Sequence, residues 1–432
     1  MRNIVHLISG VNIGSGNAYI AKYLSLNLHS CGIENVIAAT SDKGFHLLRP
    51  YDDPSASLAD LLSISPPHNR SDISLLVSQG VLHLHSMLKD TKILDIVRSM
   101  HSDYHGSIAA TVHLNHLVQA QRLKRRQVQM HWKPTPEAEL TLTHLTGKLA
   151  ADSENYYYQR QILPYCDILV HLTNIGREMM VSSYWDCNDW LSKERHPVIG
   201  NAIMLLDESP PFRSVTDELR ILYDGRISDE KGAELLAKAF VRVVREYALT
   251  HSAGQGYTLK LVIHGNEDSE SPGLLDRIKR ILGPLGTKHT EFIPWQPKVA
   301  MPINGRLLKN GEDIKYHLMS TCHLLVVPSD SETFCLAVAE GMHHRIPVLA
   351  SDLEVFDELY GNSIMRFNPQ REGSLENFLM GFVRSANSLK VQKMVERAYR
   401  QSSRFSWDCI TKDYIEQVYT PLWNGIAHSC VA

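Results

Sequence analysis

Short apolar runs alternate with amphipathic segments along almost the whole chain, and this order strongly limits the folds open to it. Runs typical of buried strands occur at 4–9, 35–40, 81–86, 108–113, 167–173 and 197–201. A second series follows at 219–224, 259–264, 291–294, 324–327, 347–351 and 364–367. Helical periodicity fills most of the intervals between them. Strands that alternate with helices favour an α/β protein with parallel sheets.

The two series indicate two domains. A chain of 432 residues is too long for one typical core, and a Pro-rich polar stretch at 206–213 separates the series. We therefore predict Rossmann-like domains at residues 1–205 and 206–405, followed by a C-terminal helical segment at 406–432. Residues 115–165 depart from the alternation and indicate an irregular or helical excursion. Ligands of such sheets bind at the carboxyl ends of the strands.

Composition narrows the class of protein further. The chain is 44% hydrophobic and 21% charged with a net charge of −3, so no basic excess favours nucleic acid. No apolar run approaches the length of a membrane span. Seven scattered cysteines without CxxC pairs suggest reduced thiols and hence a cytoplasmic protein. One stretch is basic and comprises Arg122, Lys124, Arg125 and Arg126. It is either a solvated helix face or a peripheral contact with the anionic inner face of a membrane.

The most informative motif is the run from residue 329 to residue 342. It follows the apolar strand 324–327, turns, and continues as a predicted helix, with Glu332 in the turn and Glu340 eight residues further on. The N–H groups at the start of that helix can bind an anion, and we assign this role to Phe334, Cys335 and Leu336. The two carboxylates can accept hydrogen bonds from hydroxyls. Together these groups suit a molecule that carries both phosphate and sugar.

A second motif runs from Asp224 to Gly232, again between a strand and a helix. Arg226 and Lys231 lie five residues apart, and both can converge on one anion, Arg as a fork and Lys as a point charge. A solvated charged turn is the alternative interpretation. The motif precedes the first one by about a hundred residues, and each follows a strand, which favours a shared anion site.

The two motifs, Gly-Arg-x4-Lys-Gly and Glu-x7-Glu, together resemble the signature of the retaining GT-B glycosyltransferases of family 4, the glycosyl transferases group 1. The resemblance implies a GT-B fold: two Rossmann-like domains facing across a deep cleft, with the last helix crossing back to the first domain. It also implies that Arg226 and Lys231 hold the donor diphosphate, Glu332 the sugar hydroxyls and Glu340 the ribose. Cys335 stands where the family often has glycine.

The resemblance also implies roles for residues of the N-terminal domain. His113, which closes the strand 108–113, would contact the donor sugar near its primary hydroxyl. His83, His85 and His116 are competitors for this role, and any of them could instead be structural. A glycine-rich turn after the first strand departs from the dinucleotide fingerprint in its spacing. It is either a tight structural turn or a segment that approaches the donor phosphate or the acceptor through Gly14, Ser15 and Gly16.

The function implied by the resemblance is retaining transfer of a hexose from a nucleoside-diphosphate sugar to a hydroxyl of a glycan or glycolipid, as in polysaccharide biosynthesis. UDP is the most frequent nucleotide in the family. We expect no cofactor and no metal ion, because two cationic side chains take the electrostatic role of a metal at the diphosphate. The alternatives are a sugar-nucleotide epimerase, a phosphorylase, or a catalytically degenerate scaffold or lectin on the same fold.

Overall fold

The computed structural model divides into two compact units, residues 1–202 with 407–432 and residues 203–406. It describes residues 3–9, 16–78, 80–85, 90–100, 102, 106–113, 149–150, 153–183, 196–206, 210–250, 256–268, 271–295, 301–303, 306–308 and 311–425. Most of the predicted excursion at 115–165, including its four cations, lies outside these residues, although 153–162 is helical. The described helices include none with the length and apolar character needed to cross a bilayer.

The described strands of the first unit form a seven-stranded sheet in the order β4-β3-β2-β1-β5-β6-β7. Its elements are β1 (Ile4–Ile8), α1 (Gly16–Ser30), β2 (Asn35–Ser41), β3 (Gly44–Leu48), α2 (Leu58–Ile64), β4 (Pro67–His68), α3 (Arg70–Val77), β5 (Val81–Leu84), α4 (Thr91–Ser99), β6 (Ser107–Val112), β7 (Ile168–His171) and α7 (Asn174–Ser183). The neighbouring strands β2, β1, β5, β6 and β7 pair in parallel.

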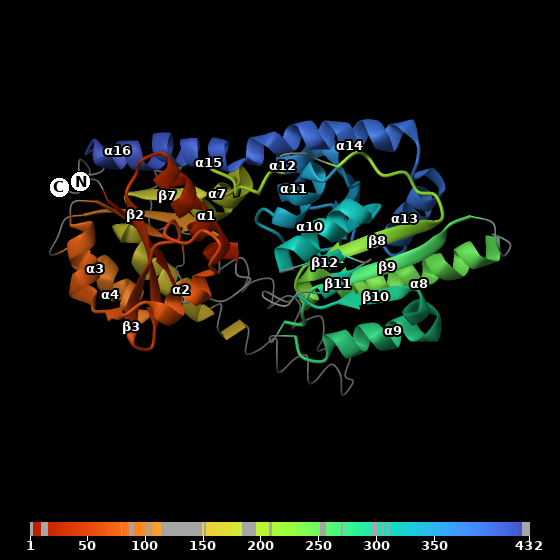
Figure 1. Ribbon diagram of the computed structural model, residues 1–432, viewed down its shortest axis with the longest axis horizontal. Helices are drawn as coiled ribbons and strands as arrows, with labels where there is room; N and C mark the ends of the chain where they lie inside the picture. Colours follow the sequence, from red (N-terminus) through yellow and green to blue (C-terminus); the bar gives the residue numbers. More distant parts are fainter. Residues whose placement is uncertain are drawn as a thin grey trace. The chain divides into compact units, whose positions relative to one another are not determined.

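The C-terminal segment belongs to the first unit, as the GT-B expectation requires. It comprises α15 (Trp407–Tyr414), a π-helical turn (Ile415–Tyr419) and α16 (Thr420–Trp423). Buried side chains of this segment, among them Trp407 and Tyr414, pack in one cluster with Ile4 of β1 and Ile20 of α1. Figure 1 shows the segment in blue along one face of the unit that contains both chain ends. Burial of these large aromatic and aliphatic side chains holds the last helices on the first unit.

The described strands of the second unit form a six-stranded parallel sheet in the order β10-β9-β8-β13-β14-β15, with helices on both faces (Figure 1). Its elements are β8 (Glu218–Asp224), α8 (Ala233–Thr250), β9 (Thr258–His264), α9 (Leu274–Lys288), β10 (Thr290–Ile293), β11 (Met301–Ile303), β12 (Arg306–Leu308), α10 (Gly311–Thr321), β13 (Leu324–Val327), α11 (Leu336–His343), β14 (Val348–Ser351), α12 (Glu354–Tyr360), β15 (Met365–Phe367), α13 (Ser374–Ser385) and α14 (Leu389–Ser402). The chain runs outward from β8 in one direction and from β13 in the other, so the strand order reverses between these two strands.

Two parts of the strand prediction are wrong. The segment 197–201 makes only an isolated bridge between His171 and Val198, and Pro197 contributes its carbonyl but has no N–H for a ladder. The short strands β3 and β4 were not expected and pair antiparallel at the edge of the first sheet. A two-residue connection between Ser41 and Gly44 turns β2 directly into β3, which a search for βαβ units does not anticipate.

Candidate active site

The two sequence motifs meet at the reversal point of the second sheet. The motif at 224–232 follows β8 and the motif at 329–342 follows β13, and these strands are neighbours in register, with Leu324 opposite Ile221. The backbone N–H of Asp330 donates to the carbonyl of Glu230 over 2.9 Å, which ties the two loops together. Open α/β sheets bind their ligands at such a reversal point, outside the carboxyl ends of the strands. The candidate site therefore lies where this fold class places a ligand.

Gly232 permits the close approach of the two loops. It has φ +71°, the left-handed region that favours glycine, and it ends the short 3-10 turn Asp229–Lys231. A Cβ at this position would lie 2.1 Å from the carbonyl oxygen of Pro328. Any side chain here would force the loop after β8 away from the loop after β13. Gly232 of the motif at 224–232 is therefore required by packing, independently of any ligand.

Lys231 and Glu332 form the direct contact between the motifs. The Nζ of Lys231 lies 2.7 Å from Oε1 of Glu332, and the hydroxyl of Ser329 donates to the same carboxylate oxygen over 2.8 Å. The Glu332 side chain is 8% exposed and that of Lys231 is 25% exposed. Burial alone would lower the pKa of Lys231, but the neighbouring carboxylate of Glu332 leads the effects that hold it above its ordinary value. Lys231 is therefore cationic throughout the physiological pH range.

Arg226 lies at the open side of the same loop. Its guanidinium is 58% exposed and contacts Asp268, whose side chain is 8% exposed, and Glu230 at 3.5 Å. The carbonyl of Arg226 accepts a 2.6 Å hydrogen bond from the buried hydroxyl of Tyr223, which fixes the backbone from which the side chain extends. A half-exposed guanidinium on a fixed backbone can turn to an incoming anion at low cost.

Glu340 lies on α11 and is paired with a residue that the sequence did not indicate. The carboxylate of Glu340 is 3% exposed and lies 2.7 Å from Nζ of Lys315 on α10. Nothing in the sequence around Lys315 distinguishes it from other lysines on amphipathic helices. Asp268, an acidic partner of Arg226 from the loop after β9, was missed for the same reason. Pairing across elements separates these residues in sequence and cannot be read from a motif.

The start of α11 differs slightly from the prediction. The helix begins at Leu336, with Cys335 as its N-cap residue, so the N–H groups of the first turn start one to two residues later than predicted. Phe334 is buried against Tyr360 and Phe405 and belongs to the core of this unit. The Tyr360 hydroxyl donates to the carbonyls of Phe334 at 2.8 Å and Cys335 at 3.2 Å, which holds the loop before the helix.

Cys335 has a left-handed backbone, with φ +67° and ψ +85°. The family glycine at this place therefore matches a conformational requirement of the loop, which this chain meets with a residue that has a Cβ. The pKa of the Cys335 thiol is raised well above its ordinary value by burial and by the carboxylate of Glu332, while Lys231 acts in the opposite direction. Glu340 contributes to the same shift. The thiol is thus within electrostatic reach of three of the predicted site residues.

The other predicted site residues, Gly14, Ser15, Gly16 and His113, belong to the first unit. Gly14 and Ser15 are outside the described residues, and Gly16 begins α1. His113 directly follows β6, as expected, and burial lowers its pKa to about 4, so its imidazole is neutral at pH 7. Its Nε2 is buried with no hydrogen-bond partner among the described residues, and its ring lies 6.0 Å from that of His85. The role predicted for His113 stays a prediction.

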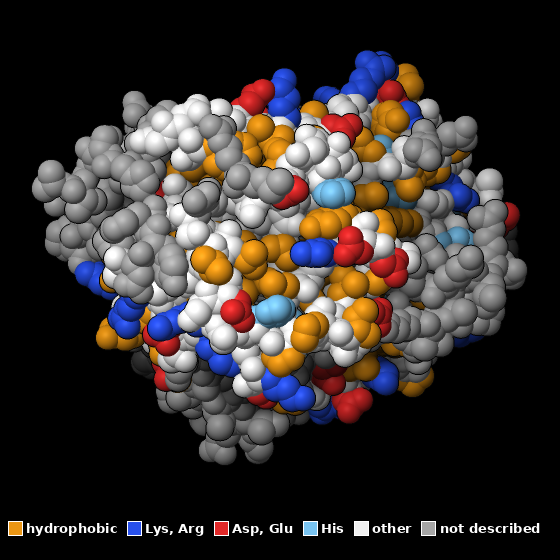
Figure 2. All heavy atoms as spheres, turned by 60° about the vertical axis from the view of Figure 1, so that its left-hand side comes forward, with side chains coloured by type: hydrophobic (Ala, Val, Ile, Leu, Met, Phe, Trp, Pro, Cys, Tyr) orange, Lys and Arg blue, Asp and Glu red, His pale blue; other side chains and the backbone are white. Residues whose placement is uncertain are grey.

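Neither the composition nor the face shown in Figure 2 favours a nucleic-acid partner. On the face shown in Figure 2, lysines and arginines are interspersed with aspartates and glutamates. The net charge of −3 agrees with this mixture. A nucleic-acid footprint would need a clustered basic face.

The class defined by these features is that of the GT-B glycosyltransferase folds. The features are two largely parallel sheets flanked by helices, last helices that belong to the first unit, and cations paired with carboxylates at the reversal point. Residues 207–368 match the family model described as glycosyl transferases group 1. The resemblance of the two motifs is thereby confirmed. A comparison with curated protein sequences finds no match.

Solved structures match over nearly the whole chain. HepE from Anabaena in complex with UDP and glucose is 12% identical with a TM-score of 0.60, covering 97% of this chain and 100% of that one. Sucrose-phosphate synthase from Thermosynechococcus elongatus is 15% identical with a TM-score of 0.65, covering 98% and 100%. A glycosyltransferase from Rickettsia africae is 12% identical with a TM-score of 0.64, covering 98% of each chain. At these identities the similarity establishes the GT-B fold.

Proposed function

We propose that the protein is a retaining glycosyltransferase that moves a hexose from a nucleoside-diphosphate sugar, with UDP as the nucleotide, to a hydroxyl of a glycan or glycolipid. The observation that carries the proposal is the 2.7 Å contact between Lys231 and Glu332. This contact brings together two residues from distant motifs at the ligand-binding edge of the sheet: a lysine suited to bind a diphosphate and a glutamate suited to bind sugar hydroxyls. The family match over residues 207–368 and the complexes of HepE with UDP and glucose support the same reaction class.

In this proposal the leaving diphosphate is stabilised by Lys231 and Arg226. Charge develops on its oxygens as the bond to the sugar breaks, and fixed cations stabilise that charge most strongly where water is excluded. Lys231 is positioned by Glu332 and is permanently protonated, while Arg226 can turn from its acidic partners to the phosphate. No divalent ion is needed at the diphosphate in this scheme, since the two side chains supply the positive charge.

The two carboxylates have complementary roles in binding the donor. Glu332 is placed beside the diphosphate cation and would accept hydrogen bonds from the ring hydroxyls of the hexose. Glu340, held by Lys315 on the neighbouring helix, would accept from the ribose. The acceptor hydroxyl would attack from the face that the leaving group vacates, and a diphosphate oxygen would take its proton. The anomeric configuration is then retained without a covalent sugar intermediate.

The decisive experiment follows hydrolysis of UDP-hexoses by the purified chain in the absence of acceptor. We expect slow release of UDP that falls about 100-fold or more in Lys231→Ala and in Arg226→Ala. Lys238→Ala is the matched control. Lys238 also forms an ion pair with a glutamate, Glu234 of α8, but its side chain is 52% exposed and neither residue belongs to the two motifs. Wild-type release in both site variants would remove these residues from the reaction.

Proton NMR of the same reaction separates the alternatives. The anomer released first reports the stereochemistry, and the α anomer from an α-linked donor agrees with retention. A sugar nucleotide epimerised without loss of UDP would instead indicate an epimerase. If the chain neither hydrolyses nor epimerises the sugar nucleotide, and if UDP, GDP and ADP leave its melting temperature unchanged, the protein is a scaffold or lectin and not an enzyme of this kind.

A further inference from the structure

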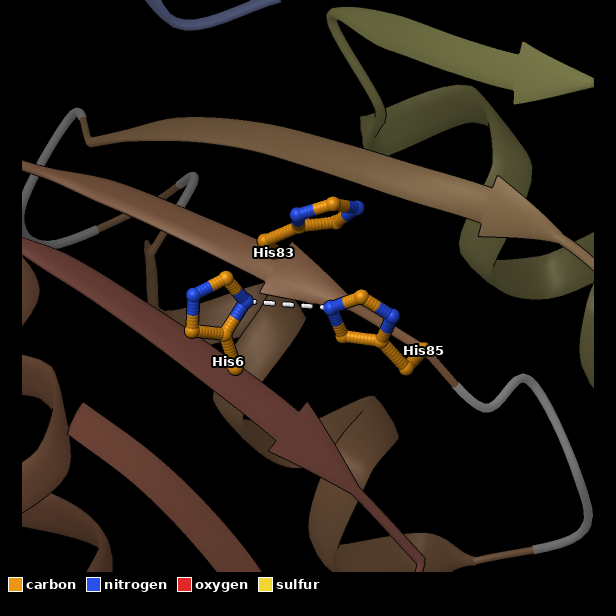
Figure 3. A group of neighbouring side chains, drawn as sticks. All are labelled: His6, His83 and His85. Atoms are coloured by element: carbon orange, nitrogen blue, oxygen red, sulfur yellow. Dashed lines mark hydrogen bonds between the residues drawn. The ribbon is translucent and has the colours of Figure 1, made fainter. Parts of the chain in front are cut away.

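Three histidines of the first unit lie side by side on one face of its sheet. His6 of β1 is directly opposite His83 of β5 in the parallel register, and His85 follows two residues later. Residues two apart on a strand point to the same face, so all three imidazoles extend from one side of the sheet. Figure 3 shows the three rings gathered over the two strands. Each side chain is fully buried, at 0% exposure.

The rings are close enough to share one ion. Nδ1 of His6 and Nε2 of His85 are 3.0 Å apart, as the dashed line in Figure 3 marks. One nitrogen from each of the three residues lies within 4.8 Å of the others. Tetrahedral zinc holds imidazole nitrogens at about 2.0–2.1 Å, which puts ligand nitrogens roughly 3.3 Å from one another. Ring shifts of up to about 1.5 Å would therefore complete the arrangement.

The hydrogen bonds of the cluster leave coordination capacity unused. Nε2 of His6 and Nδ1 of His85 are buried and have no partner among the described residues. Each neutral imidazole carries one N–H proton and one lone pair. For a cation to bind Nδ1 of His6 and Nε2 of His85 together, the proton between these two atoms moves to the second nitrogen of its own ring, so that both facing nitrogens offer lone pairs and each ring stays neutral. Leaving ring nitrogens of two buried imidazoles without a partner is costly in a core that is otherwise apolar.

His83 already has the outer contacts of a metal ligand. One of its ring nitrogens lies 2.7 Å from the hydroxyl of Tyr419 and the other lies 2.8 Å from that of Thr111. A metal at either nitrogen would replace one hydroxyl, and the remaining one would accept from the other ring N–H. Such a partner fixes the tautomer and the ring orientation of a ligating histidine. Tyr419 belongs to the C-terminal segment, so this contact reaches the last helices.

We propose that His6, His83 and His85 bind one divalent first-row transition ion, zinc by preference. Three imidazoles suit zinc and its neighbours, whereas magnesium and calcium require oxygen ligands. No carboxylate or thiolate joins the group among the described residues. Burial also lowers the pKa of each of the three imidazoles, so all present lone pairs at neutral pH. A water molecule would complete the coordination, as in three-histidine zinc sites.

The test uses the full-length, tag-free chain, stripped with a chelator and titrated with Co²⁺. We expect a visible d–d spectrum of tetrahedral cobalt that saturates at a single ion per chain and is abolished by Zn²⁺. His85→Gln and His6→Gln should each lose the spectrum. His171→Gln is the matched control, because His171 is also buried and lies 2.9 Å from His196, while no third ligand-type side chain joins this pair in the described part of the chain. A cobalt spectrum unchanged by His85→Gln would place the ion elsewhere and overturn the proposal.

A measurement on the unmodified chain covers the case in which the variants do not fold. Zinc at Nε2 of His83 would displace the Thr111 hydroxyl and keep the contact between Nδ1 and the Tyr419 hydroxyl, so it should raise the melting temperature and slow amide exchange in residues 407–425. Magnesium at the same concentration should change neither. If zinc also changes neither, the three histidines form only a hydrogen-bonded core cluster and the metal site does not exist.

Discussion

Replacing Glu332 by glutamine should separate nucleotide binding from turnover. The carboxylate lies 2.7 Å from Nζ of Lys231, the group that we assign to the diphosphate. A phosphate oxygen on the other side of Lys231 would therefore lie about 5.5 Å from Glu332, and repulsion between unit charges at that distance is about 0.8 kcal/mol in water and about 3 kcal/mol near a protein surface. Glutamine removes this repulsion but still accepts from Ser329. UDP should therefore bind Glu332→Gln about fivefold more tightly, or better.

Turnover should change in the opposite direction. The amide is a weaker acceptor for the sugar hydroxyls than the carboxylate, so transfer should fall by about 100-fold while UDP binding improves. Calorimetry with UDP and with a UDP-hexose measures both effects, and the preference for the sugar nucleotide over UDP should shrink in the variant. Glu234→Gln on the same helix as Lys238 serves as the control. Weaker UDP binding in Glu332→Gln, equal to that in Lys231→Ala, would refute the placement of this carboxylate beside the phosphate.

Three further predictions follow from the local structure. Gly232→Ala should destabilise the second unit by about 3 kcal/mol or more, whereas Gly273→Ala, with φ +78° and open space at its Cβ, should cost only about 1 kcal/mol; denaturant unfolding measures both. Cys335 should react with iodoacetamide more slowly than the exposed Cys31, since Cys335 is only partly exposed and desolvation with the carboxylate of Glu332 raises the pKa of its thiol; peptide mapping of the labelled sites checks this. The first unit should lose stability as the pH falls from about 6.5 towards 4, because burial lowers the pKa of His171 to about 3 and the unfolded chain then binds the extra proton. His171→Gln should reduce that slope by up to about 1.4 kcal/mol per pH unit, measured by unfolding at each pH.

The order of strands and helices could be predicted because it depends on local composition. Of the strands expected in the second series, each is present within about two residues of its predicted ends. The expectation of alternating strands and helices was wrong at the hairpin between Ser41 and Gly44, where β2 is followed directly by the antiparallel strand β3. Tight turns of this kind depend on a few dihedral angles, and the residues Asp42 and Lys43 carry no strong turn signal.

The candidate donor site was predictable only as far as its two motifs extend. Arg226, Lys231 and Glu332 stand next to strand ends, where a reader of sequence expects ligands. Their partners are different: Lys315 reaches Glu340 from another helix, and Asp268 reaches Arg226 from the loop after β9. The histidine cluster of the first unit was missed in the same way, because the pairing of His6 with His83 depends on the register of two strands. Tertiary neighbours cannot be derived from spacing along one segment.

The pairing of charges in the candidate donor site bears on how the proposed transferase would discriminate between ligands. Lys231 is bound to Glu332, so a ligand that engages the lysine through its diphosphate must also provide for the carboxylate that the lysine leaves. Free phosphate or UDP provides an anion but no hydroxyls for Glu332, whose side chain is only 8% exposed and cannot be fully hydrated. A nucleoside-diphosphate hexose provides both the anion and the hydroxyls. We therefore expect the proposed transferase to bind the intact donor more tightly than its nucleotide product, because only the intact donor offers hydroxyls to the buried carboxylate.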